Sequence, residues 1–298
     1  IAIGRLAIGT GVTTGTGNIG LGISALSALL AGTNNIGIGL TAGDALTTGT
    51  DNIAIGRLAA SATPDGADNI AIGRSAFAVS DGVADCNIAI GLSALGGADV
   101  SGLSNIAIGS LAMDALTTGI CNIAMGTNAL GASTTGCNNI AIGELALGAG
   151  TLACGGAGQA EGNIAIGESA LTVMTTGSNN IGIGLTSGDA LTTGTDNIAI
   201  GRLSLSASTD GADNIAIGQS ALAVSGNDAD NNIAIGSLAM GAGDVSGADN
   251  ISLGRSTMCA ATSASENIAI GATAMRAKQS GADSIAIGRG SLGTAVAG

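Results

Sequence analysis

The sequence predicts an all-β protein folded as a parallel β-solenoid of about 17 coils, each 17 or 18 residues long. Two observations support this prediction. The motif Asn-Ile-Ala-Ile-Gly recurs at this spacing along the 298-residue chain, and bulky and small residues alternate inside the motif. Alternation with period two is typical of a β-strand, and a fixed repeat of this length is typical of chains in which each unit stacks on the next.

The asparagine of the motif sets the phase of the repeat. Stacking would place these asparagines above one another, where identical side-chain amides form hydrogen-bonded ladders. We therefore interpret the row as a structural ladder rather than as a ligand-binding row. Its members are Asn18, Asn35, Asn52, Asn69, Asn87, Asn105, Asn122, Asn139, Asn163, Asn180, Asn197, Asn214, Asn232, Asn250 and Asn267. Ser284 holds the next position, and one long spacing, of 24 residues, separates Asn139 from Asn163.

The remaining motif positions predict the inside and the corner of each coil. We expect the two isoleucines to face inward and the small middle residue to face the other side. The predicted core is Ile53, Ile55, Ile70, Ile72, Ile198, Ile200, Ile215 and Ile217. The fifth position is always glycine, which indicates a positive φ or a corner without room for a Cβ; Gly56, Gly73, Gly201 and Gly218 represent it. A second short apolar segment and a polar turn complete the coil.

A longer period lies above the short one. Residues 35–58 match residues 180–203 at every position except Ala42 and Ser187, an offset of 145 residues. We interpret residues 1–298 as a single repetitive solenoid rod that contains two approximate super-repeats of this length. Because the chain starts inside a motif, we expect it to be a segment of a longer chain.

Composition excludes several classes of protein. Hydrophobic residues make up 46% of the chain, which argues against disorder, and a single proline excludes collagen. The net charge of −13 opposes binding to nucleic acid, and no apolar run is long enough for membrane insertion. Because histidine and tyrosine are absent and Lys278 is the only lysine, we expect no catalytic residues and no cofactor.

Two binding classes stay open as lesser alternatives. Calcium binding is one, because carboxylates recur just before the ladder asparagine and stacked carboxylates can share a cation; they are Asp51, Asp68, Asp196, Asp213 and Asp249. Ice binding is the other, because threonine pairs such as Thr47-Thr48 recur in the turns, although many coils lack them.

The sixth motif position and the cysteines have two interpretations each. The sixth position carries arginine in six coils but glutamate at Glu144 and Glu168, which suits a solvated edge or an inter-chain contact. The five cysteines are Cys86, Cys121, Cys137, Cys154 and Cys259. Cys121 and Cys137 lie in consecutive coils and could form a disulfide, whereas the alternative is that all five are small buried residues.

The repeat resembles those of two groups of fibrous proteins. Residues 46–60 and 191–205, with the pattern Asn-Ile-Ala-Ile-Gly-x-x-Ala-Leu after a Thr-Thr-Gly turn, carry the likeness best. They resemble the head repeats of YadA-like trimeric autotransporter adhesins and the repeats of phage and viral tail fibres. The resemblance implies a homotrimer of parallel β-rolls in which the small residues lie near the shared axis.

The function expected from these observations is structural. We expect a non-catalytic shaft of an extracellular fibre, either a cell-surface filament or a tail fibre of a virion, that self-associates as a homotrimer or filament. The alternative is a trimeric adhesin head that attaches to a host or surface. Any receptor is expected to bind outside this segment, because the segment lacks the aromatic platforms of carbohydrate sites.

Overall fold

The computed structural model describes residues 1–9, 13–80, 84–154, 160–224, 229–243, 245–278 and 280–293. The chain divides into two compact units, Ile1–Cys154 and Gly155–Gly298. The described residues contain strands, turns and bends but no helix. The predicted all-β class is therefore confirmed.

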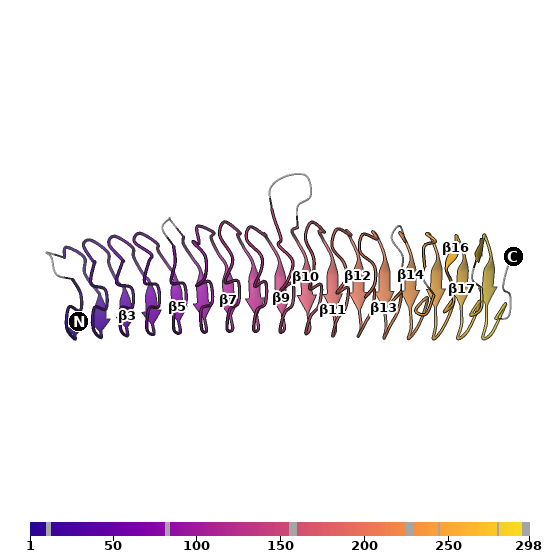
Figure 1. Cartoon of the computed structure of the whole chain (residues 1–298), viewed down its shortest axis with the longest axis horizontal. Helices are drawn as coiled ribbons and strands as arrows, with labels where there is room; N and C mark the ends of the chain where they lie inside the picture. The colour runs from indigo at the N-terminus through magenta and orange to yellow at the C-terminus, as the bar shows by residue number, and fades with distance from the viewer. Residues whose placement is uncertain are drawn as a thin grey trace. The chain divides into compact units, whose positions relative to one another are not determined.

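The first unit is a parallel β-solenoid with one short strand in each coil (Figure 1). Its strands are β1 (Ala2–Ile3), β2 (Ile19–Leu21), β3 (Ile36–Ile38), β4 (Ile53–Ile55), β5 (Ile70–Ile72), β6 (Ile88–Ile90), β7 (Ile106–Ile108), β8 (Ile123–Met125) and β9 (Ile140–Ile142). Each strand pairs in parallel with the next one along the chain, so that Ala54 of β4 lies beside Ala71 of β5. The predicted parallel solenoid is confirmed.

The second unit repeats this arrangement. Its main sheet contains β10 (Ile164–Ile166), β11 (Ile181–Ile183), β12 (Ile198–Ile200), β13 (Ile215–Ile217), β14 (Ile233–Ile235), β15 (Ile251–Leu253), β17 (Ile268–Ile270) and β19 (Ile285–Ile287). These strands also pair in parallel and in chain order. Two further strands, β16 (Ser263–Ser265) and β18 (Ser280–Ala282), pair with each other in a small second sheet.

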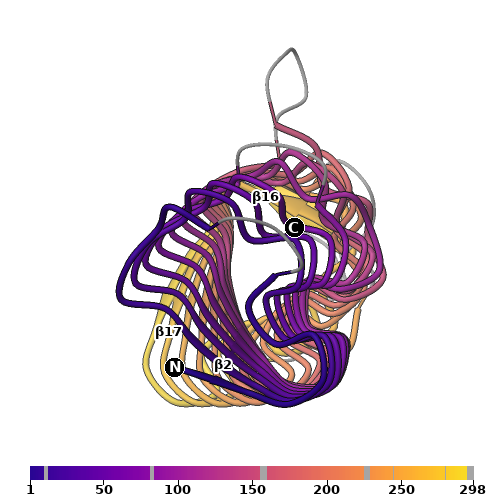
Figure 2. The ribbon, with the colours of Figure 1, turned by 90° about the vertical axis from the view of Figure 1, so that its left-hand side faces the viewer.

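Backbone hydrogen bonds between coils continue beyond the strands. The amide of Leu58 donates to the carbonyl of Leu40 one coil earlier, and the amide of Ala60 donates to the carbonyl of Ala76 one coil later. As a result, the coils of the first unit follow nearly the same outline when viewed along the stack (Figure 2). Like residues are thereby placed over like residues throughout a unit.

The side of the strand that faces the coil interior is the opposite of the predicted one. Ala54 is fully buried, whereas Ile53 and Ile55 on either side of it are only partly buried. The same pattern holds for Ile70, Ile72, Ile198, Ile200, Ile215 and Ile217. The predicted isoleucine core is therefore wrong, and the small residues lie inside their own coil rather than on an outer surface near a shared axis.

Leucine side chains explain why the inner strand position must be small. The second apolar segment of most coils points inward and buries a leucine, methionine or similar residue, such as Leu26, Leu130 and Leu147. A Cβ added to Gly37 at the middle strand position would lie 2.7 Å from Cγ of Leu26. The interior is already filled from this side, so the strand can contribute only alanine, glycine or serine to the core.

The predicted corner glycines adopt positive φ angles. The φ of Gly56 is +133°, and a Cβ there would lie 2.5 Å from the carbonyl oxygen of Gly73 in the next coil. Gly73, Gly201 and Gly218 have φ angles of 136°, 133° and 130°. Both the backbone conformation and the close approach of the neighbouring coil therefore require glycine at this corner.

We expect the two faces of the strand to respond differently to the same substitution. Ala54→Asp places an unpaired charge in the interior and should lower the free energy of unfolding by about 3 kcal/mol or more. Ile55→Asp changes a partly exposed side chain and should cost about 1 kcal/mol. Thermal denaturation in dilute solution, with hydrogen exchange to localise the effect, measures both. A larger loss for Ile55→Asp would contradict the observed orientation of the strand.

Candidate interaction face

The outward side chains of each strand form an apolar face. In the coil of β4, the outward positions are Asp51, Ile53, Ile55 and Arg57, which alternate with the inward Asn52 and Ala54. Because the strands are in register, the isoleucines of successive coils stack in two columns along each unit. The column that contains Ile55 stays considerably exposed even in coils with a neighbour on each side. The exposed fraction of the side chain is 41% at Met125 and 38% at Ile235.

Opposite charges flank this apolar face on its two edges. An acidic residue precedes the ladder asparagine on one edge, and six residues later an arginine follows the corner glycine on the other. The coils that carry both are those of Asp51 and Arg57, Asp68 and Arg74, Asp196 and Arg202, Asp249 and Arg255, and Asp283 and Arg289. All ten side chains are exposed, and no ion pair joins any of them to another described residue.

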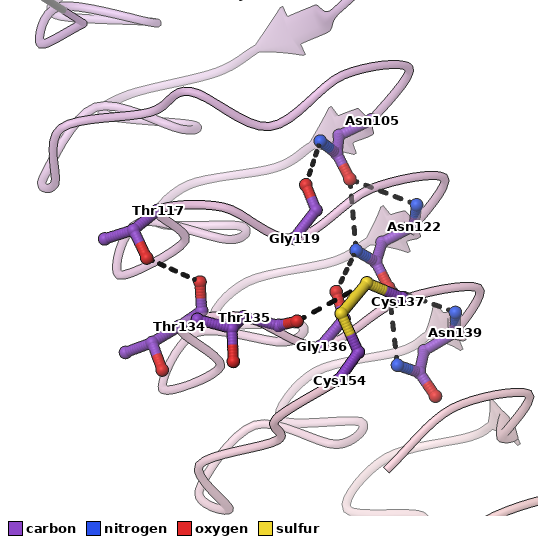
Figure 3. The surroundings of a disulfide bond; sticks show 10 residues. All are labelled: Asn105, Thr117, Gly119, Asn122, Thr134, Thr135, Gly136, Cys137, Asn139 and Cys154. Carbon is purple, nitrogen blue, oxygen red and sulfur yellow. Dashed lines mark hydrogen bonds between the residues drawn. A yellow bond between two sulfur atoms is a disulfide. The ribbon is translucent and has the colours of Figure 1, made fainter. Parts of the chain in front are cut away.

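The ladder asparagines lie inside the coils and bond to one another. The side-chain oxygen of Asn52 accepts hydrogen bonds from the backbone amide of Asn69 at 3.0 Å and from its side-chain amide at 3.1 Å. The side-chain amide of Asn52 donates to the carbonyl of Gly66 at 2.6 Å. Figure 3 shows the same contacts among Asn105, Asn122 and Asn139. The side-chain amides of the ladder are therefore hydrogen-bonded to other groups of the protein, as a structural ladder requires.

In the last described coil, Ser284 and Lys278 together replace the ladder asparagine. The backbone amide of Ser284 donates to the side-chain oxygen of Asn267 at 3.1 Å, as an asparagine would. The ammonium group of Lys278, which is buried, donates to the hydroxyl of Ser284 at 2.6 Å. The lysine chain therefore fills the space that the shorter serine leaves.

The cysteines follow neither of the two interpretations of the sequence. Cys137 is bonded to Cys154, 17 residues further on, whereas Cys121 is free and exposed (Figure 3). The Cys121–Cys137 disulfide, which the sequence left open, does not form, because the two residues hold different positions in the coil. Cys121 directly precedes its ladder asparagine, but Asn138 stands between Cys137 and Asn139. Cys86 is also exposed, so the alternative that all five cysteines are buried is wrong as well.

Three aspartates in the turns lie in partly buried surroundings. Burial raises the pKa of Asp44, Asp114 and Asp189 above the usual value for a carboxyl group, and hydrogen bonds from their own backbone amides oppose the shift only in part. One side-chain oxygen of Asp44 and one of Asp189 are buried without a hydrogen-bond partner. These carboxylates are therefore poorly solvated in the folded state.

The structure shows how the threonines are used and what the described residues offer to ligands. The hydroxyls of Thr117, Thr175 and Thr192 donate to carbonyls of the next coil at 2.9–3.0 Å, which is a structural role. Within the described ranges, no group of three histidine, cysteine, aspartate or glutamate side chains is placed to hold a metal ion. No helix there could cross a membrane.

No protein-family model matches the sequence, and no curated protein matches it. The likeness to adhesin heads and tail fibres therefore stays a resemblance of motif.

The apolar face was not predicted from the sequence, although the charged residues at its two ends indicated that it is exposed. Asp51 and Arg57 belong to the same period-two series as Ile53 and Ile55, and charged side chains are rarely buried without partners. Asn52 belongs to the series of Ala54. Extending the alternation to both ends of the motif would have placed the isoleucines outside.

We expect removal of one ladder side chain to destabilise the stack. Asn52→Ala leaves the amide of Asn69 and the carbonyl of Gly66 buried without their partners, which should lower the free energy of unfolding by about 3 kcal/mol or more. The matched control is Asn34→Ser, because Asn34 is exposed and serine occupies the same coil position at Ser104. Chemical denaturation measures both variants. Equal, small effects would show that the ladder contributes little.

We expect the buried aspartates to make stability depend on pH. Because the pKa values of Asp44 and Asp189 are raised in the folded state, their charged forms oppose folding, and this cost disappears as pH falls through the raised values. Asp44→Asn with Asp189→Asn should therefore raise Tm at pH 7 by roughly 1–2 °C per site after allowance for solvent screening. The gain should vanish below about pH 3.9, the ordinary pKa of an aspartate side chain.

Asp65 supplies a control of opposite sign for this measurement. The hydroxyl of Thr48, followed by that of Thr47, lowers the pKa of Asp65. The charged form of Asp65 therefore favours folding at neutral pH, and this contribution is lost as pH falls. Asp65→Asn should lower Tm at pH 7. A Tm difference for the Asp44 and Asp189 variant that does not change with pH would contradict the assignment.

Proposed function

We propose that this chain is a structural segment of an extracellular fibre, a shaft that performs no catalysis and self-associates as a homotrimer or filament. The observation that carries the proposal is the repetition of one set of contacts at successive levels of each unit. The asparagine ladder and the backbone bonds between coils connect each level to the next. A chain that is stabilised level by level can be lengthened by duplicating coils without new folding information.

The disulfide and the charge support an extracellular location. Disulfides such as Cys137–Cys154 persist in oxidising compartments and are rare in the cytosol of mesophiles. The net charge of −13 suits a soluble surface that does not bind nucleic acid. The motif resemblance to tail fibres and adhesin heads points in the same direction.

An adhesin head is the second candidate function. The exposed apolar face, with opposite charges at its edges, is a surface that could contact other molecules, as an attachment protein requires. The two candidates differ in what the face contacts. A shaft uses it only within the assembly, whereas an adhesin head would present part of it to a receptor.

Two measurements test the fibre proposal. Antibodies raised against this chain should label filaments on intact virions or cell surfaces in electron micrographs. The isolated chain should resist a non-specific protease, while Asn52→Ala should be cut within its stack and Asn34→Ser should behave like the wild type. Labelling confined to the cell interior, or rapid digestion of the wild type into small peptides, would refute the proposal.

A further inference from the structure

An open groove lies on the surface of the first unit, beside the polar turns of successive coils. Its volume is about 320 Å³, and its lining is almost entirely apolar. Sites for small molecules in proteins start at about 300 Å³, so the groove has room for one small ligand. All lining residues belong to one compact unit. They are Ala45, Ala62, Pro64, Val79, Ser80 and Asp99.

The groove is elongated along the stack of coils. Ala45 comes from the first coil that lines it and Asp99 from the last, three coils further on. Because stacked coils are spaced about 4.8 Å apart, the lining extends over about 14 Å. A ligand that follows the groove is therefore long and narrow.

Small side chains create the hollow, and larger ones border it. Ala45 and Ala62 hold the same position in consecutive coils, and Val79 holds this position in the coil after them. The valine side chain stays exposed to 39%, and the ring of Pro64 is partly exposed beside it. The groove therefore presents hydrocarbon that a ligand could remove from water.

Polar groups of the lining residues are engaged with the rest of the protein. The carbonyl of Pro64 accepts hydrogen bonds from the amides of Thr47 and Thr48 at 2.8 and 3.3 Å. The buried hydroxyl of Ser80 donates to the carbonyl of Val100 at 2.6 Å. These two residues consequently contribute apolar surface to the groove and fix the backbone around it.

The charges around the groove are negative. Asp99, which is exposed, is the charged member of the lining, and the exposed Asp65 follows Pro64 directly. Residues 75–154 contain no lysine or arginine, and the whole chain carries a net charge of −13. Such a field attracts a positively charged ligand and repels an anionic one.

We propose that this groove binds a small amphiphilic amine, an unbranched aliphatic chain that ends in an ammonium group. The chain lies along Ala45, Ala62 and Val79, where it is removed from water. The ammonium group contacts the carboxylate of Asp99, and this charge-assisted contact sets the direction of the ligand in the groove. This binding activity is separate from the structural role in the proposed function.

Three probe ligands test the two parts of the proposed ligand in isothermal titration calorimetry. Octylammonium should bind at least about ten-fold more tightly than butylammonium, because its longer chain removes more hydrocarbon from water. It should also bind at least about ten-fold more tightly than octanoate, which has the opposite charge. Hydrogen exchange with and without octylammonium should place the protected amides around Ala62.

Two substitutions test the apolar part of the groove. Ala62→Leu fills it and should weaken octylammonium binding at least about ten-fold. The matched control is Ala115→Leu, because Ala115 holds the same coil position outside the groove and should leave the affinity unchanged. Pro64→Thr should also weaken binding. Its fold is expected to persist, because Thr209 holds this position in the second unit and its carbonyl accepts the equivalent pair of amides.

A pair of neutralised aspartates tests the charged end. Asp99→Asn should weaken octylammonium binding about five-fold or more and reduce the preference over octanoate. Asp51→Asn changes the net charge equally but lies on the strand face, and Asn34 holds the same position one coil earlier. This control should bind octylammonium like the wild type.

Four results would overturn the inference. Octylammonium might fail to bind below its micelle-forming concentration, or octanoate might bind as tightly. Equal losses in Asp99→Asn and Asp51→Asn would show only a general attraction to the negative chain. Equal affinities for octylammonium and butylammonium would indicate a site for a lysine side chain, which ends in the same butylammonium group. None of these results bears on the fibre proposal, because filament labelling and protease resistance are measured without a ligand.

Discussion

The structure depends on one constraint, the in-register stacking of coils in which each residue lies above its equivalent. Parallel pairing such as Ile53 beside Ile70 fixes this register in the sheet, and the buried asparagine amides enforce it inside the coil. A shift by one residue would bring Asn52 outward and leave backbone groups such as the carbonyl of Gly66 buried without a donor. Because unsatisfied buried groups are costly, the ladder selects this register over its neighbours.

The same constraint determines which residue types each position of the coil accepts. At the corner, the carbonyl of Gly73 approaches Gly56 so closely that no Cβ fits, and the contact recurs at Gly73, Gly201 and Gly218. Inside, leucine from the second segment leaves room only for a small residue on the strand. Positions with exposed side chains, such as those of Arg57 and Glu144, are free to differ. The variability of a position therefore increases with its distance from the contacts between coils.

Much of the fold could be predicted from the sequence because a repeat of period 17 or 18 leaves few architectures. The coil phase, the parallel stacking and the corner glycines all follow from the motif. The orientation of the strand did not follow from its hydrophobicity, because its outer face is apolar as well. The assumption that the bulkier side of the strand is buried was wrong. Only Asp51 and Arg57, which lie at alternate positions with the isoleucines and so on the same side of the strand, indicated that this side faces outward.

Other features lay beyond local sequence rules. Leu58 and Ala60 adopt φ angles of 60° and 46°, a left-handed conformation that non-glycine residues rarely adopt and that no turn motif at these positions indicates. The hydrogen bonds of their amides to neighbouring coils hold this conformation. The Cys137–Cys154 disulfide, by contrast, had a signal in the sequence, because its two cysteines are 17 residues apart, which is one coil length.

Stacking within one chain covers only part of the outer isoleucines. Ile285 and Ile287 in the last described strand are 66% and 69% exposed, whereas Ile235 and Ile270, which have a neighbour on each side, fall to 38% and 37%. Neighbours in the column therefore hide nearly half of the side chain, and adding coils cannot hide the rest. Burial of the remaining apolar area would need contact with a surface from outside this stack of coils.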